Sequence, residues 1–177
     1  MQILSYFLVF LALIVIYFLI IMFWTCIAVA PWVPSKKKDL ERIFKVARLK
    51  PGEVFYDLGC GDGRLVFLAN QKFKAKAVGV ETSLFLILFC KIRRIFHPNK
   101  DIVFKYKSMF KEDLSRADVV YTYLLPKTLE KKLKDKFKKE LKPGARVISY
   151  VFAIKGLEPK AVDKPEQKSN TIYLYQF

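Results

Sequence analysis

The chain begins with an apolar segment that carries no charged residue. Residues 3–30 are apolar except for Ser5 and Thr25. As a helix that rises about 1.5 Å per residue, this segment is roughly 42 Å long. A hydrocarbon core is only about 30 Å thick, so the helix can cross it with some tilt. We therefore predict a transmembrane helix at residues 1–30.

The residues that follow this segment indicate its orientation. Lys36, Lys37 and Lys38 form a basic cluster, and such clusters stay on the cytoplasmic side of a membrane. We expect a single-pass membrane protein with its N-terminus outside and the remaining chain in the cytoplasm. The alternative is a cleaved signal peptide that ends at Ala30, but such peptides have a charged first region and an apolar stretch of only about 7 to 15 residues.

Beyond residue 35, short apolar runs alternate with helical patterns. The predicted helices are residues 36–49, 64–71, 84–95 and 127–141, and the predicted strands are residues 54–58, 77–81, 102–106, 118–123, 146–152 and 171–175. A polar, proline-bearing connection at residues 159–169 joins the last two strands. This order predicts a Rossmann-like, doubly wound α/β domain at residues 31–177, with a mostly parallel sheet and an antiparallel C-terminal strand.

Charge narrows the set of partners only partly. The chain has 32 Lys and Arg against 16 Asp and Glu, a net charge of +16, and all of it falls after residue 35. A basic surface attracts nucleic acid, an anionic membrane or an acidic protein by the same electrostatics. The lysine-rich helix at residues 127–142 is read as a solvated face or one that lies against anionic lipid.

The cysteines and the single histidine argue against several kinds of chemistry. Cys26, Cys60 and Cys90 lie far apart, and no Cys or His pair has metal-ligand spacing. We therefore expect neither a disulfide framework nor a metal site. His97 lies in a His-Pro-Asn turn, where a solvated loop residue is the simpler interpretation than a catalytic one.

The segment Asp57–Arg64 carries the most specific signal. Its sequence, Asp-Leu-Gly-Cys-Gly-Asp-Gly-Arg, places glycines between a predicted buried strand and a predicted helix. Glycines there allow a ligand to approach the backbone closely, and the N-terminus of the helix points into the same crevice. Compared with the dinucleotide fingerprint, the third glycine comes one residue early. Asp57 and Asp62 also flank the loop, which disfavours pyrophosphate and favours a cationic ligand.

S-adenosyl-L-methionine has the chemistry that this segment would accept. Its sulfonium and ammonium groups are positive, and its carboxylate can meet the amides of the loop. Glu81, which ends the second strand, can accept the hydrogen bonds of the ribose diol. The alternatives are an α/β turn without a ligand and another kind of nucleotide-binding domain.

The same segment closely resembles motif I of the class I methyltransferases. Further likeness is found at residues 31–35, Pro-Trp-Val-Pro-Ser, at residues 118–126, at residues 141–149 and at residues 171–175. These segments resemble the archaeal broad-specificity protein-lysine methyltransferase and the mitochondrial, membrane-anchored enzymes that modify the ADP/ATP carrier and the ATP synthase c subunit. The likeness covers residues 31–177. It implies that the Pro-Trp-Val-Pro segment folds over the site and that the cofactor is held by Asp57, Gly59, Gly61 and Glu81. We add Cys60 and Asp62 of the same loop to the predicted cofactor site.

Two positions depart from the pattern of many relatives. Ser108 and Met109 stand where many class I enzymes place an acidic or amide residue against the adenine, and we assign both to the cofactor site by that position. After the fifth strand, relatives often have a His-Glu pair before the phenylalanine. This chain has Tyr150-Val151-Phe152, so we expect substrate choice to differ.

Methyl transfer needs alignment more than acid or base groups, because the methyl carbon of a sulfonium is already activated. A lysine acceptor must first lose its proton, and an aromatic, apolar pocket lowers its pKa. We name Trp32, Tyr123 and Phe152 as the candidates that line this catalytic pocket. Ordinary core packing is the competing interpretation for each of them.

Three other functions compete with methylation of lysine in a membrane protein. A nucleic-acid methyltransferase would fit the charge, but Tyr123-Leu124-Leu125-Pro126 lacks the polar head of the Asn/Asp-Pro-Pro-aromatic tetrad of amino-methylating enzymes. A small-molecule or lipid methyltransferase would fit the anchor. A cofactor-binding protein without catalysis is the third. We predict the lysine enzyme and do not expect nucleic acid as a partner.

Overall fold

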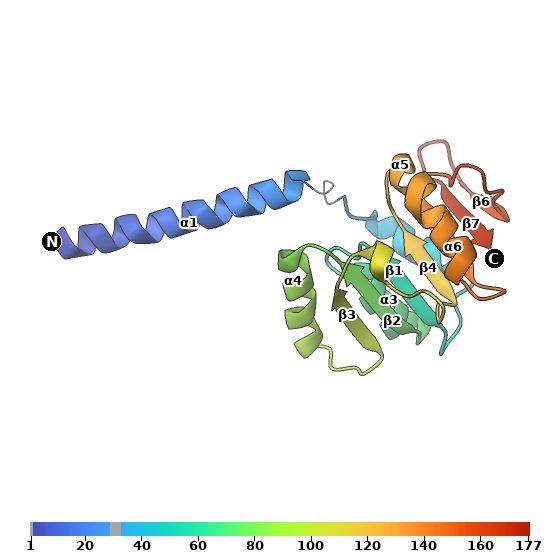
Figure 1. The fold of residues 1–177 in the computed structure, drawn as a ribbon. Coiled ribbons are helices and arrows are strands. Elements are labelled where there is room, and N and C mark those ends of the chain that lie inside the picture. Colours follow the sequence, from blue (N-terminus) through green and yellow to red (C-terminus); the bar gives the residue numbers. More distant parts are fainter. Residues whose placement is uncertain (1, 29–32) are drawn as a thin grey trace. The chain divides into compact units, whose positions relative to one another are not determined.

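The computed structural model describes residues 2–28 and 33–177, and within these ranges it leaves out the side chains of residues 22–28, Lys127, Glu130 and Lys131. The chain separates into two compact units, Met1–Val33 and Pro34–Phe177. In the first unit, α1 (Gln2–Ala28) is one continuous helix (Figure 1). Its residues Gln2–Ile21 are long and apolar enough to cross a membrane, and none of them is buried. Ala30, the end of the alternative signal peptide, and Trp32, a predicted residue of the lysine pocket, lie outside the described residues.

The second unit is built on a seven-stranded sheet. The strands are β1 (Val54–Leu58), β2 (Lys76–Glu81), β3 (Ile102–Tyr106), β4 (Val119–Thr122), β5 (Arg146–Tyr150), β6 (Ala161–Asp163) and β7 (Ile172–Gln176). Their order across the sheet is β3-β2-β1-β4-β5-β7-β6. The first five strands are parallel, while β7 runs antiparallel to both β5 and β6. The prediction of a mostly parallel sheet with an antiparallel C-terminal strand is confirmed.

Helices cover both faces of this sheet (Figure 1). On one face, α2 (Leu40–Ala47), α3 (Arg64–Phe73) and α4 (Leu84–Ile95) pack their apolar side chains against alternate residues of the strands. On the other face, η3 (Leu129–Leu133) and α6 (Lys134–Glu140) do so. The remaining short elements are η1 (Lys37–Asp39), η2 (Met109–Lys111) and α5 (Pro126–Thr128). The central strands β1, β4 and β5 are buried on both faces, which explains why their sequences are largely apolar.

Three predicted elements differ from the structure. The helix expected at residues 36–49 begins as the 3₁₀ turn η1 and ends at Ala47, because the next residue, Arg48, has a φ of 50°. The single helix expected at residues 127–141 is interrupted by the π-helical segment η3. The connection at residues 159–169 contains β6, which pairs with β7. This strand has three residues and no buried side chain, so no apolar alternation marks it in the sequence.

A buried carboxylate joins the start of the domain to its last strands. Asp39 accepts a hydrogen bond from Tyr150 Oη at 2.5 Å and one from Arg42 Nη1 at 2.8 Å. Arg42 also pairs through Nε with the Asp163 carboxylate of β6 at 2.6 Å. Because these contacts converge at the carboxyl end of β5, they fix the N-terminal segment of the domain beside that end of the sheet.

Gly79 in β2 lies against neighbouring side chains that leave no space for a Cβ atom. A Cβ atom at this position would lie 2.8 Å from Cys60 Sγ and 2.8 Å from Cδ1 of the Phe104 ring. Those distances are shorter than real carbon contacts, and buried neighbours on both sides leave little room to move. The core beneath the loop that follows β1 therefore requires glycine here.

We expect Gly79→Ala to lower the free energy of unfolding by about 1 to 3 kcal/mol, as other overpacked cores do. Lys76→Ala, at the exposed start of the same strand, is the matched control and should change stability by less than about 0.5 kcal/mol. Urea denaturation followed by circular dichroism measures both. Equal stability of the two variants would contradict the packing described above.

Candidate functional site

The loop Gly59–Gly63 connects β1 to α3 and is bonded to the end of β2. The amides of Gly59 and Cys60 both donate to the Val80 carbonyl, at 2.8 and 3.1 Å, and the Gly63 amide donates to the Cys60 carbonyl at 2.9 Å. Gly59, Gly61 and Gly63 have φ values of 85°, 55° and 74°, a region that favours glycine. The loop therefore has one defined conformation that other residues would strain.

Glu81, at the carboxyl end of β2, organises the same loop. Its Oε2 accepts a hydrogen bond from the Gly61 amide at 3.0 Å. Its Oε1 accepts from the amides of Thr82 and Ser83 at 2.7 and 2.9 Å. A carboxylate offers about four acceptor positions, so Glu81 can accept one more donor. The sequence predicted that Glu81 binds the ribose of the cofactor, but it did not predict that Glu81 also holds the glycine loop.

Four amides of the loop already donate hydrogen bonds within the protein. Those of Gly59, Cys60, Gly61 and Gly63 bond to Val80, Glu81 and Cys60 within the protein. The expectation that loop amides receive the carboxylate of a ligand stays a prediction, and these four amides already have partners within the protein. What the glycines contribute is a backbone without side chains at the surface that a ligand would touch.

Asp57 lies at the end of β1 and is only 3% exposed. Burial, together with the negative charges of Glu81 and Asp62, raises the pKa of its carboxyl group well above the ordinary range. Among the described residues, no donor forms a hydrogen bond with this carboxylate. A cation placed beside it would relieve the unfavourable electrostatics.

Asp62 is ion-paired with Arg64, its neighbour at the start of α3. Arg64 Nη2 lies 2.7 Å from Asp62 Oδ2, and Arg64 Nε lies 2.9 Å from Asp62 Oδ1. Burial alone would raise the pKa of Asp62, but the hydrogen bonds and charge of Arg64 outweigh it and lower that pKa. Asp62 therefore remains ionised and partly neutralised, while Asp57 has no such partner among the described residues.

Ser35 is held at the site by two long-range contacts. Its carbonyl accepts a hydrogen bond from Arg64 Nη1 at 3.1 Å, and its hydroxyl lies 2.7 Å from Tyr121 Oη. Ser35 is the last residue of the Pro-Trp-Val-Pro-Ser segment that was expected to fold over the site. That expectation stays a prediction for the Pro-Trp-Val-Pro stretch, because Trp32 is outside the described residues.

An aromatic cluster occupies the carboxyl ends of β4 and β5. The ring of Tyr123 lies 4.9 Å from that of Tyr150, edge to face, and 6.4 Å from that of Phe152, stacked. Tyr121 lies 6.3 Å from Tyr150. Burial and the hydrogen bond to Asp39 raise the pKa of Tyr150 to about 12, so it stays neutral. The structure thus brings Tyr123 and Phe152 together and adds Tyr121 and Tyr150, which the sequence reasoning missed.

The backbone between these rings is strained at Val151. Its φ is 72°, a value that is a genuine outlier for a β-branched residue and costs about 1 to 3 kcal/mol. The Val151 amide donates to the Thr171 carbonyl at 2.8 Å, and Ser149 Oγ donates to the Phe152 carbonyl at 2.6 Å. Bonds on both sides hold the turn that directs Phe152 toward Tyr123.

Met109 is the predicted adenine neighbour that reaches the loop. Its Cε would lie 3.6 Å from a Cβ atom on Gly59, so its thioether lies beside the start of the glycine loop. Ser108 precedes it as the first residue before η2 and makes no capping hydrogen bond with its side chain. Of this pair, Met109 is therefore the one with a contact at the loop.

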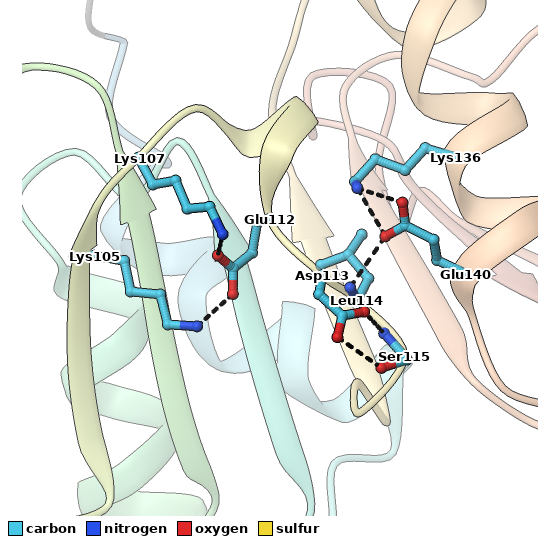
Figure 2. A network of polar contacts seen from close by, with 8 residues as sticks. All are labelled: Lys105, Lys107, Glu112, Asp113, Leu114, Ser115, Lys136 and Glu140. Atoms are coloured by element: carbon cyan, nitrogen blue, oxygen red, sulfur yellow. Dashed lines mark hydrogen bonds and ion pairs between the residues drawn. The ribbon is translucent and has the colours of Figure 1, made fainter.

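A polar network holds the segment that carries Met109 (Figure 2). The Glu112 carboxylate is 1% exposed and pairs with Lys105, and its Oε2 lies 3.0 Å from Lys107 Nζ. The Leu114 amide donates to Glu140 Oε2 at 3.1 Å. The two lysines are partly exposed, but leaving the buried Glu112 carboxylate without a partner would be costly. These contacts therefore hold the segment beside β3 and α6.

The geometry thus places Asp57, the glycine loop and Glu81 around the ends of β1 and β2. It places Tyr123 and Phe152 at the ends of β4 and β5. Residues 57–161 match the family model of the ANTKMT methyltransferase domain. This chain belongs to that family. Membership confirms the prediction of an S-adenosylmethionine-dependent methyltransferase, and a solved structure of the same fold contains S-adenosylhomocysteine.

Curated relatives of this methyltransferase differ in how much of their length is matched. A protein-lysine N-methyltransferase of Saccharolobus islandicus is 39% identical over 150 residues, which cover 82% of this chain and 92% of that protein. The adenine nucleotide translocase lysine N-methyltransferase of Mus musculus is 31% identical over 75% of this chain. The lysine N-methyltransferase of the ATP synthase c subunit from Homo sapiens is 30% identical over 69%. The matches span 57% and 52% of these two proteins.

Among solved structures, an RNA methyltransferase from Salinibacter ruber in complex with S-adenosyl-L-homocysteine superposes with a TM-score of 0.76. It is 31% identical to this chain, and the match covers 81% of this chain and 93% of that one. Its described substrate differs from that of the curated relatives, so the acceptor of the methyl group is a separate question from the family.

The buried Asp57 generates a prediction about stability and pH. Because its pKa is raised in the folded state, the protein loses stability as pH rises from the unfolded value of about 3.9 toward the folded value. We expect Asp57→Asn to remove this loss and to raise the free energy of unfolding at pH 7 by at least about 1 kcal/mol. The advantage should vanish near pH 4.

Urea denaturation between pH 4 and pH 8 measures this difference. Glu166→Asn, which replaces an exposed carboxylate far from the loop in the sequence, is the control and should show no such trend. An Asp57→Asn variant that is less stable than the wild type at pH 7 would show that the carboxylate is structural.

Proposed function

We propose that this methyltransferase transfers a methyl group from S-adenosylmethionine to the side-chain amine of lysine in a membrane protein. The observation that carries the substrate class is the 39% identity to the Saccharolobus islandicus protein-lysine N-methyltransferase, 92% of which is matched. The names of two further relatives give lysines of adenine nucleotide translocase and of the ATP synthase c subunit as their targets. These names support a target that lies in a membrane.

The residues around the glycine loop fit this cofactor. Three carboxylates, Asp57, Asp62 and Glu81, lie at or beside the loop, and Asp57 is buried with a raised pKa. Such a site repels a pyrophosphate and suits the ammonium and sulfonium charges of S-adenosylmethionine. When bound, this cofactor supplies a methyl group on a positively charged sulfur, which is displaced as a neutral thioether.

We assign distinct tasks to the residues of this cofactor site. Glu81 keeps one acceptor position for the ribose diol, since three amides occupy the others. Asp57 offsets positive charge on the ligand. Gly59 allows close approach, and Met109 beside it provides an apolar wall for the adenine. Cys60 contributes through its backbone, because its thiol is buried against Gly79.

The aromatic cluster at the ends of β4 and β5 is the proposed pocket for lysine. Tyr123 and Phe152 present stacked rings, and we assign Trp32 to the same pocket from its place in the sequence alone. Apolar rings disfavour the ammonium form of lysine and lower its pKa, which yields the neutral amine that attacks the methyl carbon. The same rings attract the methylated ammonium product.

We further propose that α1 is a single-pass anchor and that the methyltransferase unit is cytoplasmic. The support is the uninterrupted apolar helix Gln2–Ile21 and the basic cluster that begins at Lys36. An anchored enzyme samples a thin layer at the bilayer, which raises its effective concentration toward membrane proteins.

RNA is the second candidate substrate. It is favoured by the Salinibacter ruber structure, described as an RNA methyltransferase and 31% identical, and by the net charge of +16. Against it, the residues after β4 lack the polar head that holds a target amine in many nucleic-acid enzymes. A lipid acceptor would be equally accessible to an anchored enzyme.

Membranes that contain the full chain should separate these acceptors when they are incubated with methyl-radiolabelled S-adenosylmethionine. We expect label in protein, released by protease and recovered as methyllysine after hydrolysis. Label sensitive to nuclease would establish RNA, and label extracted into organic solvent would establish a lipid. Glu81→Gln should abolish labelling, while the exposed Glu166→Gln should not.

The lysine pocket makes a prediction of its own. Tyr123→Leu should lower kcat/KM for the protein acceptor about tenfold. The ring would lose its cation-π contact with the positive charge that develops on the lysine nitrogen during transfer, and such a contact contributes roughly 0.5 to 2 kcal/mol. Tyr123→Phe keeps the ring and should stay within about threefold of the wild type by the same reasoning. Affinity for S-adenosylhomocysteine, measured by calorimetry, should be unchanged in both. Equal losses in the two variants would assign the role to the hydroxyl and not to the ring.

A further inference from the structure

Helix α4 exposes an apolar face that nothing in the described part of the chain covers. Its buried residues are Ile87 and Cys90. Large apolar side chains with exposures between 47% and 76% occupy the other side and its end, namely Leu84, Phe85, Leu88, Phe89, Ile92, Ile95 and Phe96. Contiguous apolar patches of this kind mark interaction sites in soluble proteins.

The spacing of these residues gives one continuous stripe. Leu84, Leu88 and Ile92 follow one another at four-residue intervals, and Phe85 and Phe89 form the adjacent row. Residues at such intervals lie on the same side of a helix. Twelve residues form α4, which is roughly 18 Å of helix at about 1.5 Å per residue. The stripe is therefore long enough to lie flat on a surface.

The charges beside this stripe favour an anionic partner. No acidic residue occurs from Thr82 to Lys100, whereas Lys91, Arg93, Arg94 and Lys100 are basic. Arg93 turns toward the domain, where it lies 4.5 Å from the centre of the Phe67 ring. Lys91 is exposed and can extend its charge past the apolar side chains, as lysines do at a membrane interface.

We infer that the exposed face of α4 binds the surface of an anionic lipid bilayer. An apolar stripe with basic residues and no acids is the pattern of helices that lie in the plane of a membrane interface. The inference rests on the proposed anchoring by α1, because a tethered domain meets this one partner at high local concentration. Each basic residue near an anionic leaflet strengthens such binding.

This surface is coupled to the cofactor loop. Two residues separate Glu81 from the start of α4, and Ser83 caps the helix by accepting from the Leu86 amide at 3.4 Å. Cys90 Sγ donates to the Gly61 carbonyl at 3.2 Å, and Arg93 Nη1 donates to the Asp62 carbonyl at 3.5 Å. A bilayer bound to α4 would therefore hold the carboxyl edge of the sheet close to lysines at the membrane surface.

The test uses the full chain in vesicles of phosphatidylcholine and phosphatidylglycerol that contain a lipid with a photoactivatable group on its acyl chain. Binding to vesicles alone would be uninformative, because α1 already provides it. After illumination, peptide mass mapping should find lipid adducts within residues 84–96 as well as within α1. Replacing phosphatidylglycerol by phosphatidylcholine should reduce the adducts on α4 several-fold and leave those on α1 unchanged.

Paired substitutions make this test specific. Phe89→Gln with Ile92→Gln should lower adducts on α4 roughly tenfold, since both side chains leave the lipid. Val162→Gln, at an exposed apolar position of β6, is the control and should change nothing. Adducts confined to α1 in the wild type would overturn the inference, as would crosslinking of α4 to a second copy of the chain or to another protein.

The outcome is separable from that of the proposed function. If the labelled membranes yield no methyllysine while α4 carries lipid adducts, lysine is not the acceptor, and α4 is still a membrane-binding surface. If methyllysine forms and α4 carries no adducts, α4 does not bind the bilayer, and the assignment of lysine as acceptor holds. S-adenosylhomocysteine binding should be unchanged in the Phe89, Ile92 double variant, which shows that the loop is intact.

Discussion

Two acceptors at the end of β2, the Val80 carbonyl and the Glu81 carboxylate, hold the glycine loop in place, and the rest of the site depends on these bonds. They turn the chain sharply after β1 and leave the Asp57 carboxylate buried, without a cationic partner among the described residues. A loop fixed in this way does not need to order itself when a ligand arrives, which is how an enzyme that relies on alignment gains its rate.

The same bonds distribute negative charge unevenly. Arg64 forms an ion pair with Asp62, and backbone amides donate hydrogen bonds to Glu81. Asp57 is instead buried beside these two carboxylates, which raises its pKa. The folded protein thus stores an unfavourable interaction that a positive ligand relieves. This imbalance supports the proposal that the loop holds a positively charged ligand.

The sequence predicted the parallel strands and α4 well, because strands buried on both faces and long helices leave strong local patterns. It also predicted that Asp57, Gly59 and Glu81 gather at one edge, since parallel strands that adjoin one another end together.

What it could not predict depends on contacts between distant residues. Ser35 and Tyr121 are 86 positions apart, and Asp39 and Tyr150 are 111 apart. The exposed strand β6 and the π-helical η3 leave no periodic signal, and periodicity alone does not reveal that one side of α4 is uncovered.

The left-handed backbone at Val151 stores strain beside the aromatic cluster. Asparagine, aspartate or glycine would adopt this conformation at lower energy than valine does. The hydrogen bonds on either side of Val151 hold the turn in spite of this cost. A turn that is kept by its neighbours and not by its own preference gives Phe152 one orientation, so the strain is exchanged for a fixed ring.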